Sequence, residues 1–123
     1  MENKNVFDVM IEKQKELQFR LGTDIDNLDL KERGKFIKEL TWWVVDELGE
    51  MIHELPYAKF WSKKYDETGY DFEKQYQLCK EEFIDVITFL MSIAASLGFT
   101  GEEIEKMYLE KNGVNHTRQD NNY

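Results

Sequence analysis

Hydrophobic residues recur every three to four positions along most of this chain, which predicts an all-α fold. The first predicted helix runs from about Val6 to Leu21 and ends at Gly22. After a polar loop, Asp29 caps a long second helix, with Glu32 three residues later as in a capping box. Pro56 stops that helix, because proline cannot continue the backbone hydrogen bonding.

The second half of the chain predicts two further helices. An aromatic and lysine-rich connection over Tyr57 to Tyr70 precedes a third helix from about Asp71 to Leu97, with Gly98 as its C-cap. Thr100 opens a capping box for a short helix that ends near Glu110. The tail, Lys111 to Tyr123, is polar and without periodicity, so we expect no helix there.

The second and third helices are apolar around more than one face, which is typical of helices covered on most sides. Four helices in 123 residues cannot cover such a helix well, so a second subunit is expected to do so. We therefore predict one all-α domain over residues 1–123. Its architecture is a four-to-five-helix bundle that forms a homodimer through helix packing.

Composition narrows the function classes. A net charge of −9 argues against binding a nucleic acid polymer, which needs a basic face. No apolar run approaches the roughly 18 residues of a membrane span, and the start of the chain has no signal-peptide pattern. The single cysteine, Cys79, fits a reducing cytoplasm. With only His53 and His116 and no cysteine cluster, oxygen ligands and Mg²⁺ or Mn²⁺ are favoured over zinc.

Two carboxylate pairs carry the strongest chemical signal. Glu47 and Glu50 lie three residues apart on the second helix, and Glu82 and Asp85 on the third, so each pair shares one helix face. Acidic pairs are common on solvated helices, but both of these pairs adjoin apolar stripes. Desolvating a carboxylate in such surroundings is costly unless a positively charged side chain or a metal ion compensates its charge. The pattern predicts a divalent cation between the two helices.

Other residues admit two interpretations. Trp61 is either a core aromatic in a loop or a wall for a nucleobase, with Lys63 or Lys64 reaching phosphates. Gln14 and Gln18, four residues apart, either face solvent or offer a donor and an acceptor to a pyrimidine edge. The cations of the tail either fray with it or close over a triphosphate.

The motifs resemble those of the all-α nucleoside triphosphate pyrophosphohydrolases, and within them the dimeric dUTPase family. That family has Glu-x-x-Glu on one helix and Glu-x-x-Asp on the next, as at 47–50 and 82–85 here. Residues 10–18 look like its first helix, and residues 60–64 are similar to its tryptophan segment. Residues 111–123 look like its C-terminal motif, which supplies contacts to phosphates and sugar.

The resemblance implies Mg²⁺-dependent hydrolysis of dUTP to dUMP and pyrophosphate, with Mn²⁺ as a substitute cation. It implies metal ligands at Glu47, Glu50, Glu82 and Asp85. Glu50 is favoured as the general base, with Glu47 or Asp46 as candidates. The substrate-binding residues that it implies are Gln14, Gln18, Trp61, Lys64, Lys111, Asn115, Arg118 and Tyr123.

Two departures keep alternatives open. Asn122 stands where the family usually has glycine, which affects closure of the tail. Gln18 stands where many dUTPases carry Asp or Asn, and here the chain is more similar to the T-even phage dCTP/dUTP pyrophosphatases. The alternatives are a dCTP/dUTP pyrophosphatase, a broader MazG-type enzyme, or a non-catalytic helical module that binds a partner protein. A phage-encoded chain would act in the host cytoplasm.

Overall fold

The computed structural model describes residues 4–122, and within them it contains four α-helices and no strand. The predicted all-α class is therefore confirmed. The elements, in chain order, are α1 (Val6–Arg20), the 3₁₀ turn η1 (Ile25–Asn27), α2 (Leu30–Glu54), the 3₁₀ turn η2 (Lys64–Asp66), α3 (Phe72–Leu97) and α4 (Gly101–Asp120).

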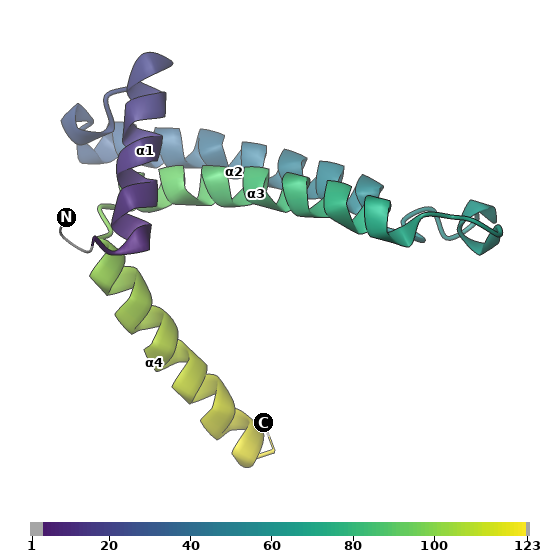
Figure 1. Ribbon diagram of the computed structural model, residues 1–123. Helices are drawn as coiled ribbons and strands as arrows, with labels where there is room; N and C mark the ends of the chain where they lie inside the picture. Colours follow the sequence, from purple (N-terminus) through teal and green to yellow (C-terminus); the bar gives the residue numbers. More distant parts are fainter. Residues whose placement is uncertain (1–3, 123) are drawn as a thin grey trace.

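The helices form an elongated arm with a crosspiece at one end (Figure 1). α2 and α3 lie side by side as a long antiparallel pair, α1 crosses one end of it, and η2 lies at the other end. The small core sits at the crossing, where Ile11 of α1 packs with Ile25 and with Ala94 and Ala95 of α3. The small alanines let the two helices approach closely, since interaxial distance depends on the side chains at the contact.

Local side-chain chemistry fixes where the helices begin and end. The Asp29 side chain accepts a hydrogen bond from the backbone N–H of Glu32 at 2.8 Å. Thr100 and Glu103 form both hydrogen bonds of a capping box. Gly98 ends α3 in the left-handed conformation, with φ of 79°, which residues with a Cβ adopt only at a cost. These three caps were predicted from the sequence and are confirmed.

The prediction that the tail has no helix is wrong, because α4 continues to Asp120. The segment from Lys111 onward has no apolar stripe, so periodicity gave no signal for it. It extends a helix whose first turn is already formed and capped, and each added residue gains one backbone hydrogen bond without a new nucleation step. Tyr123 lies outside the described residues.

α4 leaves the rest of the molecule at a sharp angle, and its base is held by the first turn of α1 (Figure 1). The Gly101 N–H donates to the Asp8 carboxylate at 2.7 Å, and Asn5 Nδ2 donates to Glu105 at 3.1 Å. A Cβ at Gly101 would collide with the Asn5 side chain and lie 2.9 Å from the Asp8 backbone nitrogen. The close contact between α1 and α4 therefore requires glycine here.

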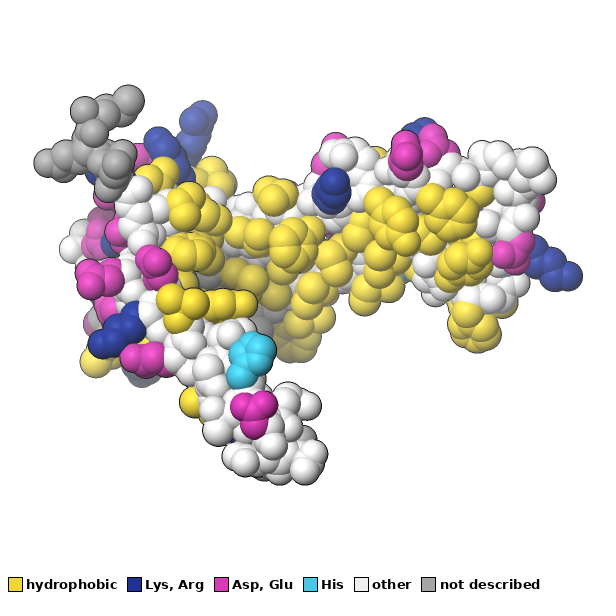
Figure 2. Space-filling view, turned by 60° about the horizontal axis from the view of Figure 1, so that its bottom comes forward, with side chains coloured by type: hydrophobic (Ala, Val, Ile, Leu, Met, Phe, Trp, Pro, Cys, Tyr) yellow, Lys and Arg dark blue, Asp and Glu magenta, His cyan; other side chains and the backbone are white. Residues whose placement is uncertain are grey.

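Much apolar surface is exposed. Figure 2 shows hydrophobic side chains running along the arm. The exposed apolar residues of α2 and α3 include Trp42, Phe83, Ile84 and Leu90. The accessible surface is 9837 Å², whereas a compact monomer of this mass exposes about 7,000 Å². Among the described residues no single helix has the length and apolarity of a membrane crossing; α3 and α4 reach it only together, and a bend of 106° separates them.

Candidate functional site

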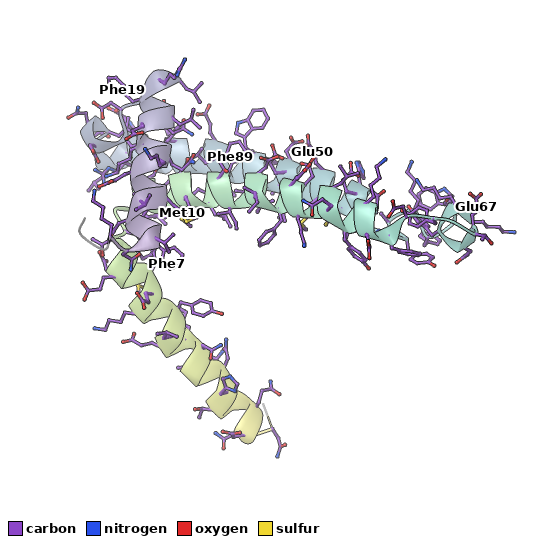
Figure 3. The ribbon with its side chains drawn as sticks, in the orientation of Figure 1. Phe7, Met10, Phe19, Glu50, Glu67 and Phe89 are labelled. Atoms are coloured by element: carbon purple, nitrogen blue, oxygen red, sulfur yellow. The ribbon has the colours of Figure 1, made fainter. Side chains whose placement is uncertain are left out.

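The two carboxylate pairs meet where α2 and α3 face each other. One oxygen each from Glu47, Glu82 and Asp85 lie within 4.8 Å of one another, and the same holds for Asp46, Glu47 and Glu50. Glu47 belongs to both groups and joins them into one cluster. Figure 3 labels Glu50 on α2, part-way along the arm. The three-residue spacing aligns each pair on its own helix, and the antiparallel packing of α2 against α3 brings the pairs together.

The cluster has an inner and an outer layer. Glu47 and Glu82 are half-buried, whereas Glu50 and Asp85 are exposed, so each pair has one inner and one outer carboxylate. The Oε2 atoms of Glu47 and Glu82 are buried and have no hydrogen-bond partner among the described residues. A buried acceptor without a partner is rare in folded proteins and requires an explanation.

Burial and mutual repulsion raise the affinity of the inner carboxylates for protons. Desolvation, followed by repulsion from Glu50 and Asp85, raises the pKa of Glu47 to about 7. Desolvation, followed by repulsion from the same two residues, also raises the pKa of Glu82. Without a cation, Glu47 thus takes up a proton much closer to neutral pH than an ordinary glutamate does.

These residues fit a hard divalent cation. The donor set consists only of carboxylate oxygens, which Mg²⁺ and Mn²⁺ prefer, and no cysteine or histidine belongs to it. The two orphaned Oε2 atoms are acceptors that a cation would satisfy. Glu47, Glu50, Glu82 and Asp85 are the residues that would hold it.

A cavity of about 370 Å³ adjoins the cluster and reaches across to α1. Glu47 lies at one side of the cavity and Gln18, which is buried, at another. Trp43 and Phe89 form part of its wall, with nearly parallel rings whose centroids are 6.4 Å apart. The remaining lining residues are Leu21, Phe36, Glu39 and Leu40. This size and mixture of apolar walls with a few polar groups is typical of small-molecule sites.

Gln14 and Gln18 are tied to α3 by a single hydroxyl group. The Ser92 Oγ donates to Gln14 Oε1 at 3.2 Å and accepts a hydrogen bond from Gln18 Nε2 at 3.4 Å. Of the two interpretations of these glutamines, the structure therefore excludes side chains directed only toward solvent.

The other predicted substrate residues lie on different elements of the chain. Trp61 is 69% exposed beside Phe60, near the end of the arm that is remote from α1. Lys64 begins η2, where its Nζ lies 5.1 Å from the centre of the Tyr65 ring. The structure thus does not bring Trp61 or Lys64 to the cavity beside Glu47 within one chain.

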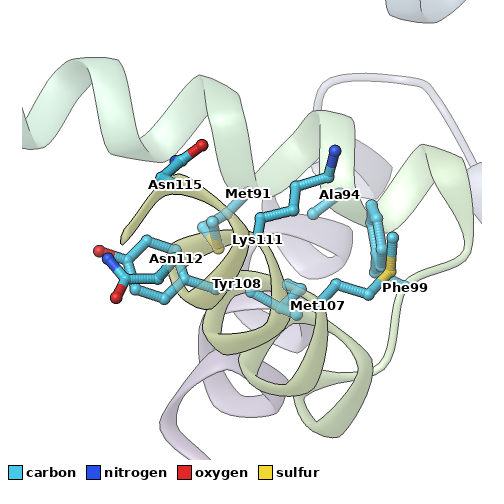
Figure 4. A pocket seen from close by; sticks show the side chains of 9 residues that line it. Met91, Ala94, Phe99, Met107, Tyr108, Lys111, Asn112 and Asn115 are labelled. Atoms are coloured by element: carbon cyan, nitrogen blue, oxygen red, sulfur yellow. The ribbon is translucent and has the colours of Figure 1, made fainter. Parts of the chain in front are cut away.

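Lys111 and Asn115 line a second cavity, of about 430 Å³, between the end of α3 and α4 (Figure 4). Met91 and Phe99 provide apolar walls there. Arg118 borders a hollow formed by α4 alone. The three substrate residues predicted on this helix, Lys111, Asn115 and Arg118, thus line hollows other than the cavity beside Glu47 in a single chain.

Comparison with known proteins decides the family. A family model described as dUTPase matches residues 6–97 and 91–123, which together cover nearly the whole chain. The chain belongs to this dUTPase family. A dCTP pyrophosphatase of Enterobacteria phage LZ5 is 32% identical over 147 aligned positions, covering 100% of this chain and 86% of the relative. The dCTP pyrophosphatase of Enterobacteria phage T4 is 29% identical over 145 positions, covering 99% and 85%. No solved structure matches the chain.

Three cavity and network residues of this dUTPase-family chain were missed at the sequence level. Trp43 precedes Glu47 by four residues, and Phe89 follows Asp85 by four, so each aromatic ring shares a helix face with a carboxylate. That spacing was a usable signal. Ser92 gave none, because one serine in an apolar helix does not reveal which side chains of α1 it meets.

Proposed function

We propose that this protein is a metal-dependent pyrophosphohydrolase that converts a pyrimidine deoxynucleoside triphosphate to its monophosphate and pyrophosphate. Membership of the dUTPase family and the two phage relatives support nucleotide pyrophosphohydrolase activity. The observation that carries the proposal is the carboxylate cluster with two orphaned buried oxygens, next to a cavity that reaches Gln18.

Mg²⁺, with Mn²⁺ as a substitute, is the proposed cofactor, held by the four clustered carboxylates. When bound, such a cation supplies positive charge against the phosphate oxygens and makes a water molecule more acidic. The carboxylates would hold the cation against which the triphosphate oxygens lie, and Trp43 and Phe89 line the cavity beside them.

Glu50 is the proposed general base. It is exposed and adjoins Glu47 within the cluster, so it can accept a proton from water at the edge of the site. Glu47 and Asp46 are the other candidates. Glu47 belongs to both carboxylate groups, so we assign it to holding the cation.

dUTP and dCTP are the two candidate substrates. The family description favours dUTP, and the names of the two phage relatives favour dCTP. Gln14 and Gln18 are the proposed base-reading residues, since an amide offers both a donor and an acceptor.

A homodimer is also proposed. The accessible surface exceeds that of a compact monomer by a few thousand Å², which is the range that obligate dimers bury. A second copy covering the arm would also be the source of the substrate residues that a single chain leaves remote from Glu47, namely Trp61, Lys64, Lys111, Asn115 and Arg118. Light scattering coupled to gel filtration measures the mass in solution.

The decisive experiment is pyrophosphate release from dUTP, dCTP, dTTP, dATP and dGTP, each with Mg²⁺ and with EDTA. We expect Mg²⁺-dependent release from dUTP, dCTP or both, and little from the purine nucleotides. Absence of Mg²⁺-dependent release from every nucleotide would refute the proposal. Release from dCTP alone would assign the activity named for the phage relatives.

A further inference from the structure

Ser92 is the buried link between α3 and the two glutamines of α1. Its exposed fraction is 0%, and its hydroxyl donates to Gln14 Oε1 while accepting from Gln18 Nε2. A serine hydroxyl has one proton to donate. If that proton goes to Gln14, the contact with Gln18 requires the amide nitrogen of Gln18 to be the donor.

These two bonds determine which atoms the glutamines leave for another molecule. Ser92 engages Gln14 through its oxygen and Gln18 through its nitrogen, so Gln14 Nε2 and Gln18 Oε1 are the atoms that it leaves unengaged. Rotation of an amide about its last torsion exchanges oxygen and nitrogen, and that torsion has a broad, roughly two-fold preference. A hydroxyl that donates to one amide and accepts from the other holds the two amides in opposite polarity.

We propose that Ser92 is a positioning residue that sets the polarity of this amide pair, so that α1 presents one donor and one acceptor to the pyrimidine. The inference rests on the proposed function. Gln18 lines the cavity that reaches Glu47, so one amide of the pair and the carboxylate cluster border the same space.

The resulting pattern fits both candidate pyrimidines. Cytosine has an amino donor next to the N3 acceptor, and uracil has an N3–H donor next to a carbonyl acceptor. Each base therefore offers an adjacent donor and acceptor to Gln18 Oε1 and Gln14 Nε2, with a small sideways shift between the two. Acceptance of both dCTP and dUTP follows from one fixed pair of amides.

The test compares Ser92→Ala with Ser96→Ala. Ser96 is the matched control, because it is 1% exposed, lies one turn later on α3, and donates to the Ser92 carbonyl at 2.9 Å. For Ser92→Ala we expect KM for dUTP and dCTP to rise roughly tenfold, the loss expected for one or two hydrogen bonds, with kcat within about twofold. For Ser96→Ala we expect KM within about twofold of the wild type. Ser92→Thr, which keeps the hydroxyl, should restore most of the affinity.

Equal changes in KM for the two alanine variants, or a fall in kcat at unchanged KM, would overturn the positioning role. Circular dichroism and thermal melting establish that each variant folds. If Ser92→Ala does not fold, Ser92→Cys takes its place, since it leaves no cavity and its thiol weakens both hydrogen bonds. If the wild type hydrolyses no nucleotide, the proposed function fails on its own. The affinities of the Ser92 and Ser96 variants for α,β-imido-dUTP, measured by calorimetry, are then compared in place of KM. If the wild type does not bind this nucleotide, the inference is overturned as well.

Discussion

Replacing Glu47 with glutamine should stabilise the metal-free protein while destroying its activity. The variant keeps the shape of the side chain and removes the most strongly perturbed charge of the cluster. The difference between a pKa of about 7 in the folded protein and the ordinary value of 4.5 sets a ceiling of about 3.4 kcal/mol. Glu47 is only half-buried, so solvent screening reduces the expected gain to about 1–2 kcal/mol.

The sign follows from proton binding. Because the pKa of Glu47 is raised on folding, the folded state binds the proton more tightly than the unfolded state between pH 4.5 and about 7. The free energy of unfolding of the wild type should therefore fall as pH rises through that window, and the full loss is present above pH 7. Glu47→Gln should lack this part of the pH dependence.

Urea unfolding at pH 5, 6, 7 and 8 in EDTA, at one protein concentration, measures the effect. Glu81→Gln, at an exposed position next to Glu82, is the control for removing an acidic charge outside the cluster. The reasoning is refuted if Glu47→Gln is no more stable than the wild type at pH 8, or if both show the same dependence on pH.

Three further predictions concern the site and the base of α4. Glu50→Gln and Asp85→Asn should each lower kcat about 10²-fold or more with an unchanged far-UV circular dichroism spectrum, and normal turnover by either would remove its assigned role. Mg²⁺ should raise the melting temperature of the wild type but hardly that of Glu47→Gln, as measured by differential scanning fluorimetry, and equal shifts would place the cation elsewhere. Gly101→Ala should lower the free energy of unfolding by about 1–3 kcal/mol, because its methyl group would collide with α1. Gly113→Ala, which has open space around it, should raise the free energy of unfolding by about 0.5–1 kcal/mol. Equal responses of the two variants in urea unfolding would contradict the contact.

The helices were predictable wherever local chemistry marks them. Asp29, Thr100 and Gly98 carry signals that work through nearby backbone atoms, so their effect can be read without knowing the fold. The second half of α4 lacked such a signal, because hydrophobic periodicity reports burial and this helix has no buried stripe beyond its base. Its helical state comes from continuation of an existing helix.

In the site, too, features set within one helix were predictable and features set between helices were not. Spacing along one helix predicted which carboxylates share a face, and the structure brings those of α2 and α3 together. Contacts between helices were beyond reach, since the register of α1 against α3 decides that Ser92 meets two glutamines. Sequence also gave no indication that the inner and outer carboxylates differ in exposure, because that depends on how closely the two helices pack.

The footing of α4 on the first turn of α1 has a mechanical consequence. Twenty helical residues span about 30 Å, so a tilt of about 5° at Gly101 moves the far end by about 2.6 Å. Arg118 rides near that end, whereas Lys111 sits halfway along. The hydrogen bond between Gly101 and Asp8 fixes the base of α4. A small change in that contact therefore changes where Arg118, at the far end of the helix, lies.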